Sequence, residues 1–114
     1  MSNEAILLAQ KIYHILDTKK LENIEVLDVH EITTLADIFI IVIGANTRQT
    51  KALADELEDA LSEEGIEVCQ KEGYDTANWI LMDYGNVIVH VLYKEDADFY
   101  GLNRLWQDGK ILLF

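Results

Sequence analysis

The residues best suited to chemistry lie in one short apolar stretch, "WILMDYGNVIVHV", at positions 79–91. Asp83 and His90 interrupt this stretch, and such a pair could serve as an acid and a base. No serine or cysteine lies beside them to complete a nucleophilic triad, although distant residues could still converge. The three histidines, His14, His30 and His90, lack the paired spacing of metal ligands. We therefore predict no catalytic residue, no metal site and no cofactor.

The same stretch predicts a β-hairpin. Gly85 and Asn86 form a two-residue loop with glycine first, which favours a type II′ turn and sets the register of both strands. Because side chains alternate along a strand, they sort onto two faces. One face, expected to join the core, carries Ile80, Met82, Tyr84, Val87, Val89 and Val91. The other, typical of a recognition surface, carries Trp79, Leu81, Asp83, Ile88, His90 and Leu92. Alternatively, a helix covers this second face, and His90 and Trp79 are core residues.

Apolar periodicity along the rest of the chain predicts alternating helices and strands. Helices are expected over 3–17 and from position 46 or 47 to Gly65, with strands over 24–29 and 36–44. The 36–44 run is continuously apolar, which indicates a strand buried on both faces. A short strand near 66–70 and helical turns within 96–106 complete the prediction. The fold class is α/β, a single domain over residues 1–114 with a mixed β-sheet flanked by helices.

Composition restricts the classes of partner. Nine basic and twenty-one acidic residues give a net charge of −12, which repels phosphate backbones, so little or no direct nucleic-acid contact is expected. This charge suits a basic protein partner, or it only keeps the protein soluble.

The single cysteine, Cys69, forms no internal disulfide, and the N-terminus lacks the features of a secretory signal. No apolar run reaches the ~18 residues of a membrane span. A cytoplasmic protein without a membrane partner is expected.

The junction "GANTRQ" at 44–49 offers backbone N–H groups that could bind an anion, but it lacks the glycine-rich phosphate-binding signatures. It is similar to the nucleotidyltransferase superfamily, in which a Gly-Ser turn precedes a pair of metal-binding carboxylates. Here Ala45 replaces the serine, and Asp55 and Glu56 point in different directions on a predicted helix. A nucleotidyltransferase-like fold without catalytic residues is therefore expected. A nucleotide-binding domain using Gly44–Arg48 and a generic dimerisation module remain alternatives.

Four segments together resemble the ribosomal silencing factor family, also called Iojap-like proteins: "ADIFIIVIGANTRQTKALAD" (36–55), "EG" (72–73), "WILMDYGNVIVHV" (79–91) and "FYGLNRLW" (99–106). The resemblance implies a non-enzymatic translational repressor that docks on the large ribosomal subunit through its protein fourteen. There it would sterically block joining with the small subunit, especially under nutrient limitation. The resemblance also implies a possible homodimer.

The resemblance further implies which residues bind the partner. They are Asp37, Arg48, Gln49, Lys51, Trp79, Leu81, Asp83, Tyr84, His90, Tyr100 and Trp106. The hairpin register independently places Trp79, Leu81, Asp83 and His90 on one face. Tyr84 falls on the opposite, core-facing side, where a structural role is expected.

Overall fold

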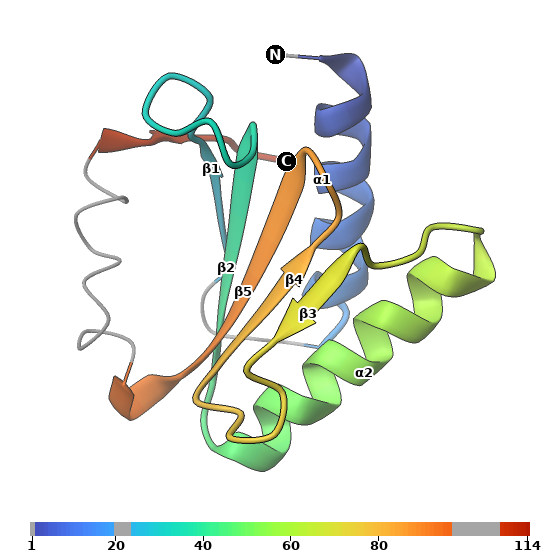
Figure 1. The fold of residues 1–114 in the computed structure, drawn as a ribbon, viewed down its shortest axis with the longest axis vertical. Coiled ribbons are helices and arrows are strands. Elements are labelled where there is room, and N and C mark those ends of the chain that lie inside the picture. The colour runs from blue at the N-terminus through green and yellow to red at the C-terminus, as the bar shows by residue number, and fades with distance from the viewer. Residues whose placement is uncertain (1, 20–23, 97–107) are drawn as a thin grey trace.

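A mixed β-sheet with two helices packed on it makes up the described part of the protein (Figure 1). The structure is a computed structural model, and it describes residues 2–19, 24–96 and 108–114. Its elements, in chain order, are α1 (Asn3–Asp17), β1 (Ile24–Asp28), β2 (Ile38–Gly44), α2 (Thr47–Glu63), β3 (Gln70–Glu72), β4 (Trp79–Asp83), β5 (Val87–Tyr93), the 3₁₀ turn η1 (Lys94–Asp96) and β6 (Lys110–Ile111). The strand order is β3-β4-β5-β2-β1-β6. Only the central β2–β5 pair is parallel among these strands, so the predicted mixed sheet is confirmed.

Local capping explains where both helices begin and where α2 ends. Ser2 accepts a hydrogen bond from the backbone N–H of Ala5, and Asn46 accepts one from that of Gln49. Each cap satisfies one of the N–H groups that a helix start leaves without a partner. At the end of α2 the chain turns at Gly65, whose φ is +80°. The two predicted helices are therefore confirmed.

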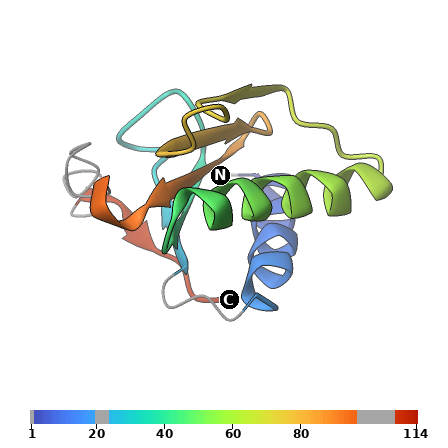
Figure 2. The same ribbon diagram turned by 90° about the horizontal axis from the view of Figure 1, so that it is seen from below.

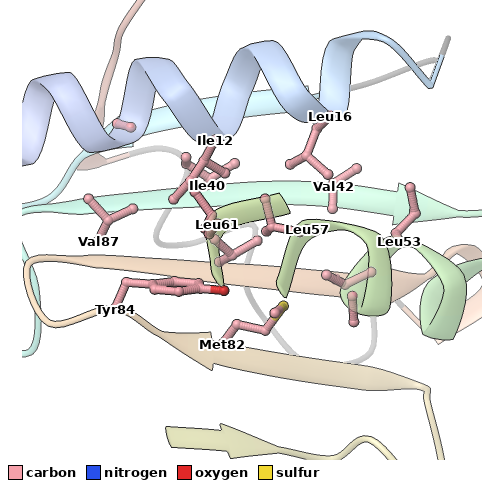
Figure 3. Packing of buried hydrophobic residues seen from close by; sticks show 14 of the residues in the cluster. Ile12, Leu16, Ile40, Val42, Leu53, Leu57, Leu61, Met82, Tyr84 and Val87 are labelled. Atoms are coloured by element: carbon pink, nitrogen blue, oxygen red, sulfur yellow. The ribbon is translucent and has the colours of Figure 1, made fainter. Parts of the chain in front are cut away.

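Both helices pack on the same face of the sheet (Figures 1 and 2). Ile12 and Leu16 of α1 and Leu57 and Leu61 of α2 are fully buried there. They meet the hairpin face that was expected to join the core, so that prediction is confirmed (Figure 3). Burial of each such side chain contributes about 1.5–3 kcal/mol to folding.

The predicted helices flank the sheet on one side only, because α1 and α2 both pack on the same face. Side chains of β2 alternate, so Ile40 faces the helices while Phe39 and Ile41 point to the opposite side. A second apolar cluster lies on that side, made of Leu27, Val29, Ala36, Phe39, Ile41, Ile88 and Leu92. The two helices bury their apolar faces against one side of the sheet and against each other. As predicted, β2 is buried on both faces.

The hairpin of β4 and β5 has the register that the glycine-first turn predicts. Trp79 pairs with Leu92, Leu81 with His90, and Asp83 with Ile88. Gly85 has a φ of +93°, whereas Asn86 is not in the positive-φ region, as a type II′ turn requires. The turn therefore fixes which side chains share a face.

Two edge strands differ from the prediction. The short strand expected near 66–70 exists but lies further along the chain, because β3 runs from Gln70 to Glu72. Gln70 pairs with Asp83, the last residue of β4, and the pairing ends there apart from the backbone N–H of Cys69, which donates to the Asp83 carbonyl. Ile66 and Val68 pack against the core instead. The short strand β6 was not predicted; it pairs with Leu27 and Asp28 of β1. Helical turns were expected within 96–106, but only Asp96 of that range is among the described residues.

Candidate functional site

The sheet face turned away from α1 and α2 carries three cross-strand rows of side chains, which we call the mixed face. Rows run across β4, β5 and β2, because paired residues point to the same side of a sheet. The rows are Trp79–Leu92–Ile43, Leu81–His90–Ile41 and Asp83–Ile88–Phe39. The mixed face is therefore apolar along its middle, with one half-buried carboxylate at the end nearest the turn.

Carboxylates flank the middle row of the mixed face on both sides. Glu72 of β3 pairs with Leu81, and Glu25 of β1 pairs with Ile41, so both acids project from the same face as the row. Glu72 is exposed and Glu25 is half-buried. Five of the nine row residues are buried, and those that a partner can reach are the half-buried Trp79, Leu81, Asp83 and Ile43. Partly exposed apolar side chains beside a charged rim are typical of a protein-binding surface, and these charges favour a basic partner.

Trp79 and His90 are joined by a hydrogen bond on the mixed face. The indole Nε1–H of Trp79 donates to Nδ1 of His90 over 3.0 Å. The His90 ring also meets Phe39 edge to face, with ring centroids 4.6 Å apart. Trp79 is half-buried, whereas only 3% of His90 is exposed. Burial lowers the pKa of His90 from its ordinary 6.5 to about 4, so the ring is neutral at physiological pH.

Comparison with known proteins identifies the family of the chain. A family model described as "Ribosomal silencing factor during starvation" matches residues 2–112. The chain belongs to the ribosomal silencing factor family. Membership supports a ribosome-associated role in silencing translation, as the family's name states.

Two curated silencing factors and one solved structure illustrate how similar the chain is to its relatives. The ribosomal silencing factor of Halalkalibacterium halodurans is 40% identical over 109 residues, which cover 96% of this chain and 92% of that one. The factor of Bacillus subtilis is 41% identical over 95 residues, covering 83% and 80%. A crystal structure of a Bacillus halodurans protein matches with a TM-score of 0.81 and 36% identity, covering 94% of this chain and 97% of that one.

Two residues of the predicted partner site, His90 and Tyr84, are buried. His90 lies in a central strand between β4 and β2, and the Phe39 and Trp79 rings pack on it. Tyr84 lies on the core side, as its register predicted, and is 7% exposed. Burial raises the pKa of the Tyr84 hydroxyl, and no described residue forms a hydrogen bond with it. Neither ring presents a large surface to a partner.

Asp37 and the remaining hairpin residues of the predicted site are half-buried, on the mixed face or beside the hairpin turn. Asp83 accepts a hydrogen bond from the backbone N–H of Gly85 over 2.7 Å, so one carboxylate oxygen stabilises the turn. Asp37 is half-buried, and its backbone N–H donates to the carbonyl of Asn86. Asp37 and Asp83 thus both lie at the turn end of the mixed face. Leu81 is half-buried in its middle row.

The structure does not place Arg48, Gln49 and Lys51 on the mixed face, because they begin α2 on the opposite side of the sheet. Gln49 accepts a hydrogen bond from the backbone N–H of Ala45 over 2.6 Å, which completes the helix cap. The ammonium of Lys51 lies over the ring of Tyr74, 5.4 Å from its centroid. Arg48 is exposed. The last two predicted residues, Tyr100 and Trp106, lie outside the described residues.

The possible anion site at 44–49 is occupied by the chain's own side chains. The backbone N–H groups of Ala45 and Gln49 donate to Gln49 and Asn46, respectively. These are two of the donors that a phosphate could use at a helix start, so the arrangement favours a cap over a nucleotide site. Among the described residues no group of three or more acidic, histidine or cysteine side chains could hold a metal ion. No helix in those ranges is long and apolar enough to cross a membrane.

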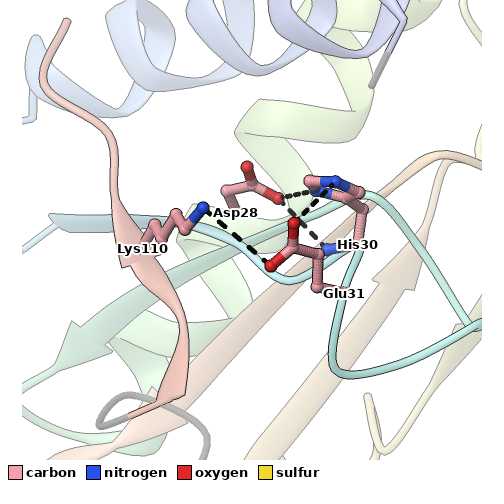
Figure 4. A network of polar contacts seen from close by, with 4 residues as sticks. All are labelled: Asp28, His30, Glu31 and Lys110. Atoms are coloured by element: carbon pink, nitrogen blue, oxygen red, sulfur yellow. Dashed lines mark hydrogen bonds and ion pairs between the residues drawn. The ribbon is translucent and has the colours of Figure 1, made fainter.

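A polar cluster at the far edge of the sheet was not predicted (Figure 4). Asp28, at the end of β1, accepts hydrogen bonds from the backbone N–H and the ring of His30. Glu31 lies within ion-pair distance of His30 and of Lys110 in β6. Burial alone would raise the pKa of Asp28, but the hydrogen bonds from His30 outweigh it and lower that pKa below 3.8. The spacing Asp-x-His at 28–30 was the available signal in the sequence.

Proposed function

We propose that the chain is a ribosome-binding translational repressor that docks on the large subunit through protein fourteen of that subunit. Its bulk there would block joining with the small subunit, especially under nutrient limitation. The observation that carries the proposal is the accessible part of the mixed face: the half-buried Trp79 and Leu81 with acidic flanks, in a member of the silencing factor family.

Within the mixed face we assign the apolar contacts to Trp79 and Leu81. Both are half-buried, so each retains surface that a partner can cover. Aromatic residues near the centre of an interface commonly contribute most of the binding energy. Asp83, together with Glu25 and Glu72, would pair with cationic side chains and accelerate encounter with a basic partner. Asp37 would extend this acidic end.

The other predicted contacts rest on the family resemblance. Arg48 and Lys51 would form a second, smaller contact at the start of α2, and Gln49 would hold that helix start in place. Tyr100 and Trp106 are assigned to the same partner. His90 and Tyr84 would act from within the fold.

Several further properties follow from this role. A factor that acts by bulk needs no catalytic group, so we propose that the protein is not an enzyme. A net charge of −12 argues for contact with a ribosomal protein and against direct RNA contact. Ribosome binding places the protein in the cytoplasm without a membrane partner. A homodimer that buries the mixed face would compete with docking.

The experiment that tests the proposal is co-sedimentation of the purified protein with isolated large and small ribosomal subunits, each separately. We expect retention on the large subunit alone. A subunit-joining assay should then show fewer complete ribosomes as the protein is added. Absence of retention on either subunit at low salt, with the protein folded, would rule out this function.

Substitution of Trp79 by alanine tests the assignment of the mixed face. If Trp79 is a principal contact, its truncation should weaken binding by about 2 kcal/mol or more, roughly thirtyfold. Leu7→Ala is the matched control, because Leu7 is an exposed apolar residue on α1. Equal binding of the two folded variants would remove Trp79 from the site.

A further inference from the structure

The hydrogen bond between Trp79 and His90 determines where the histidine carries its proton. An indole nitrogen can only donate, so Nδ1 of His90 must be the unprotonated acceptor in the 3.0 Å contact. A neutral imidazole then carries its one proton on Nε2. Burial keeps the ring neutral, which preserves Nδ1 as an acceptor across the physiological range.

The two residues are diagonal neighbours on adjacent antiparallel strands. Trp79 pairs with Leu92 and His90 pairs with Leu81, so the two rings lie on the same face, one row apart. Phe39 meets the His90 ring edge to face from β2 on its other side. His90 is therefore held by its neighbours, while Trp79 retains exposed surface. The fixed member of the pair orients the accessible one.

We propose that His90 is a positioning residue for docking: its Nδ1 atom holds the Trp79 indole in the orientation that the ribosomal partner meets. This inference rests on the proposed function, since it gives His90 a role in the same binding event. His90 acts through Trp79 and makes no contact with the partner. Loss of one such hydrogen bond should weaken binding about five- to tenfold, because a single bond has a modest net contribution.

Nuclear magnetic resonance of the free protein tests the geometry without the ribosome. In a uniformly ¹⁵N-labelled sample, a scalar coupling across the N–H···N bond should connect Nε1 of Trp79 with Nδ1 of His90. The His90 nitrogen shifts should report a neutral ring protonated at Nε2, and Trp79→Phe assigns the indole signal. A ring protonated at Nδ1 would overturn the proposal.

Two substitutions of His90 separate positioning from packing. His90→Asn places an amide oxygen near the position of Nδ1 and retains an acceptor, whereas His90→Leu is apolar and has none. Large-subunit binding should fall about five- to tenfold in His90→Leu and recover in His90→Asn. Recovery is the decisive readout, because asparagine fills the site less well than leucine and a purely packing role would favour leucine.

A double-mutant cycle with Trp79→Phe completes the test. Phenylalanine keeps an aromatic ring but has no donor, so His90→Leu should have little further effect in that background. Equal binding of wild type and His90→Leu would overturn the positioning role while leaving the proposed function intact. Failure of the wild-type protein to bind large subunits would overturn the proposed function, and the docking role of His90 with it.

Discussion

The hydroxyl of Thr50, in the first turn of α2, lies 2.7 Å from the carbonyl oxygen of Ala77 and joins the helix to the loop that leads into β4. Both residues are fully buried. Ala77 has a φ of +63°, a left-handed conformation that is uncommon for residues other than glycine. Trp79 follows two positions later. The Thr50 hydroxyl oxygen also lies 2.8 Å from the carbonyl oxygen of Thr47, and its single proton can be donated to only one of the two carbonyls at a time. When it is donated to Ala77, the bond stabilises an unfavourable backbone conformation directly before the mixed face.

Replacement of Thr50 by valine should lower the free energy of unfolding by about 1–3 kcal/mol. Valine keeps the branched shape but leaves the buried carbonyl of Ala77 without its donor. Urea denaturation followed by circular dichroism measures the change. Thr47→Val, at an exposed position of the same helix, is the control and should stay within about 0.5 kcal/mol of wild type. Equal values for the two variants would show that the bond contributes nothing.

Two glycines with similar backbone angles should respond very differently to alanine. Gly65 has a φ of +80° and open space around it, so Gly65→Ala should cost only the backbone penalty of about 1–2 kcal/mol. Gly73 has a φ of +77°, but a Cβ atom there would lie 2.0 Å from the carbonyl oxygen of Trp79. Gly73→Ala must therefore also displace the start of β4.

We expect Gly73→Ala to be much less stable than Gly65→Ala and to bind large subunits weakly even at temperatures where it is folded. Thermal unfolding and co-sedimentation measure the two effects. Similar stability of both variants would mean that the chain at Trp79 can shift without cost.

The buried state of His90 makes stability depend on pH in a defined direction. The folded-state pKa is about 4, below the ordinary 6.5, so between these values the unfolded chain binds a proton that the folded protein does not. The free energy of unfolding should therefore fall as the pH drops from 6.5 towards 4, by an amount on the order of 3 kcal/mol.

His90→Asn should flatten this part of the pH profile, because asparagine does not titrate. Urea unfolding from pH 7.5 to 4.5 provides the measurement. His14→Gln, at an exposed position on α1, controls for the loss of a histidine elsewhere in the chain. A His90→Asn profile parallel to that of wild type would contradict the burial of a neutral histidine.

Asp28 predicts a second pH dependence, in a lower range. Its folded-state pKa lies below the ordinary 3.8, so its contribution to stability is present above that value and is lost as the pH falls through the folded pKa. Asp28→Asn should be less stable than wild type near neutral pH, and the difference should shrink below pH 3.8. Asp59→Asn, at an exposed position on α2, controls for the loss of one charge. A difference that persists unchanged to pH 2.5 would contradict the prediction.

Local signals in the sequence were enough to predict the helices and the hairpin. Ser2 and Asn46 are short polar caps placed directly before apolar periodic segments, and Gly85 determines the turn and with it the register of β4 and β5. These features depend on residues close together in the chain. The sharing of one face by Trp79 and His90 could be predicted for the same reason.

Features that depend on distant partners were not predicted. The position of β3 follows from where β4 ends, and β6 forms only because the edge of β1 is available. The burial of His90 depends on Phe39, which belongs to another strand. Nothing local indicates that Ala77 adopts a positive φ, since Thr50 is on α2. In each case the deciding contact joins segments that sequence patterns describe separately.

The parallel pairing of β2 with β5 sets the order in which the protein can be completed during its own synthesis. These strands form the centre of the sheet, yet Ile38 pairs with Val87, so the closing loop contains α2, β3 and β4. Pairings between residues this far apart form slowly, because the entropy of loop closure is lost before contacts compensate for it. A nascent chain that has just exposed β2 can pair this apolar strand with β1 on one edge, but the other edge stays open until β5 leaves the exit tunnel. Slow translation lengthens that interval, and with it the demand for chaperones.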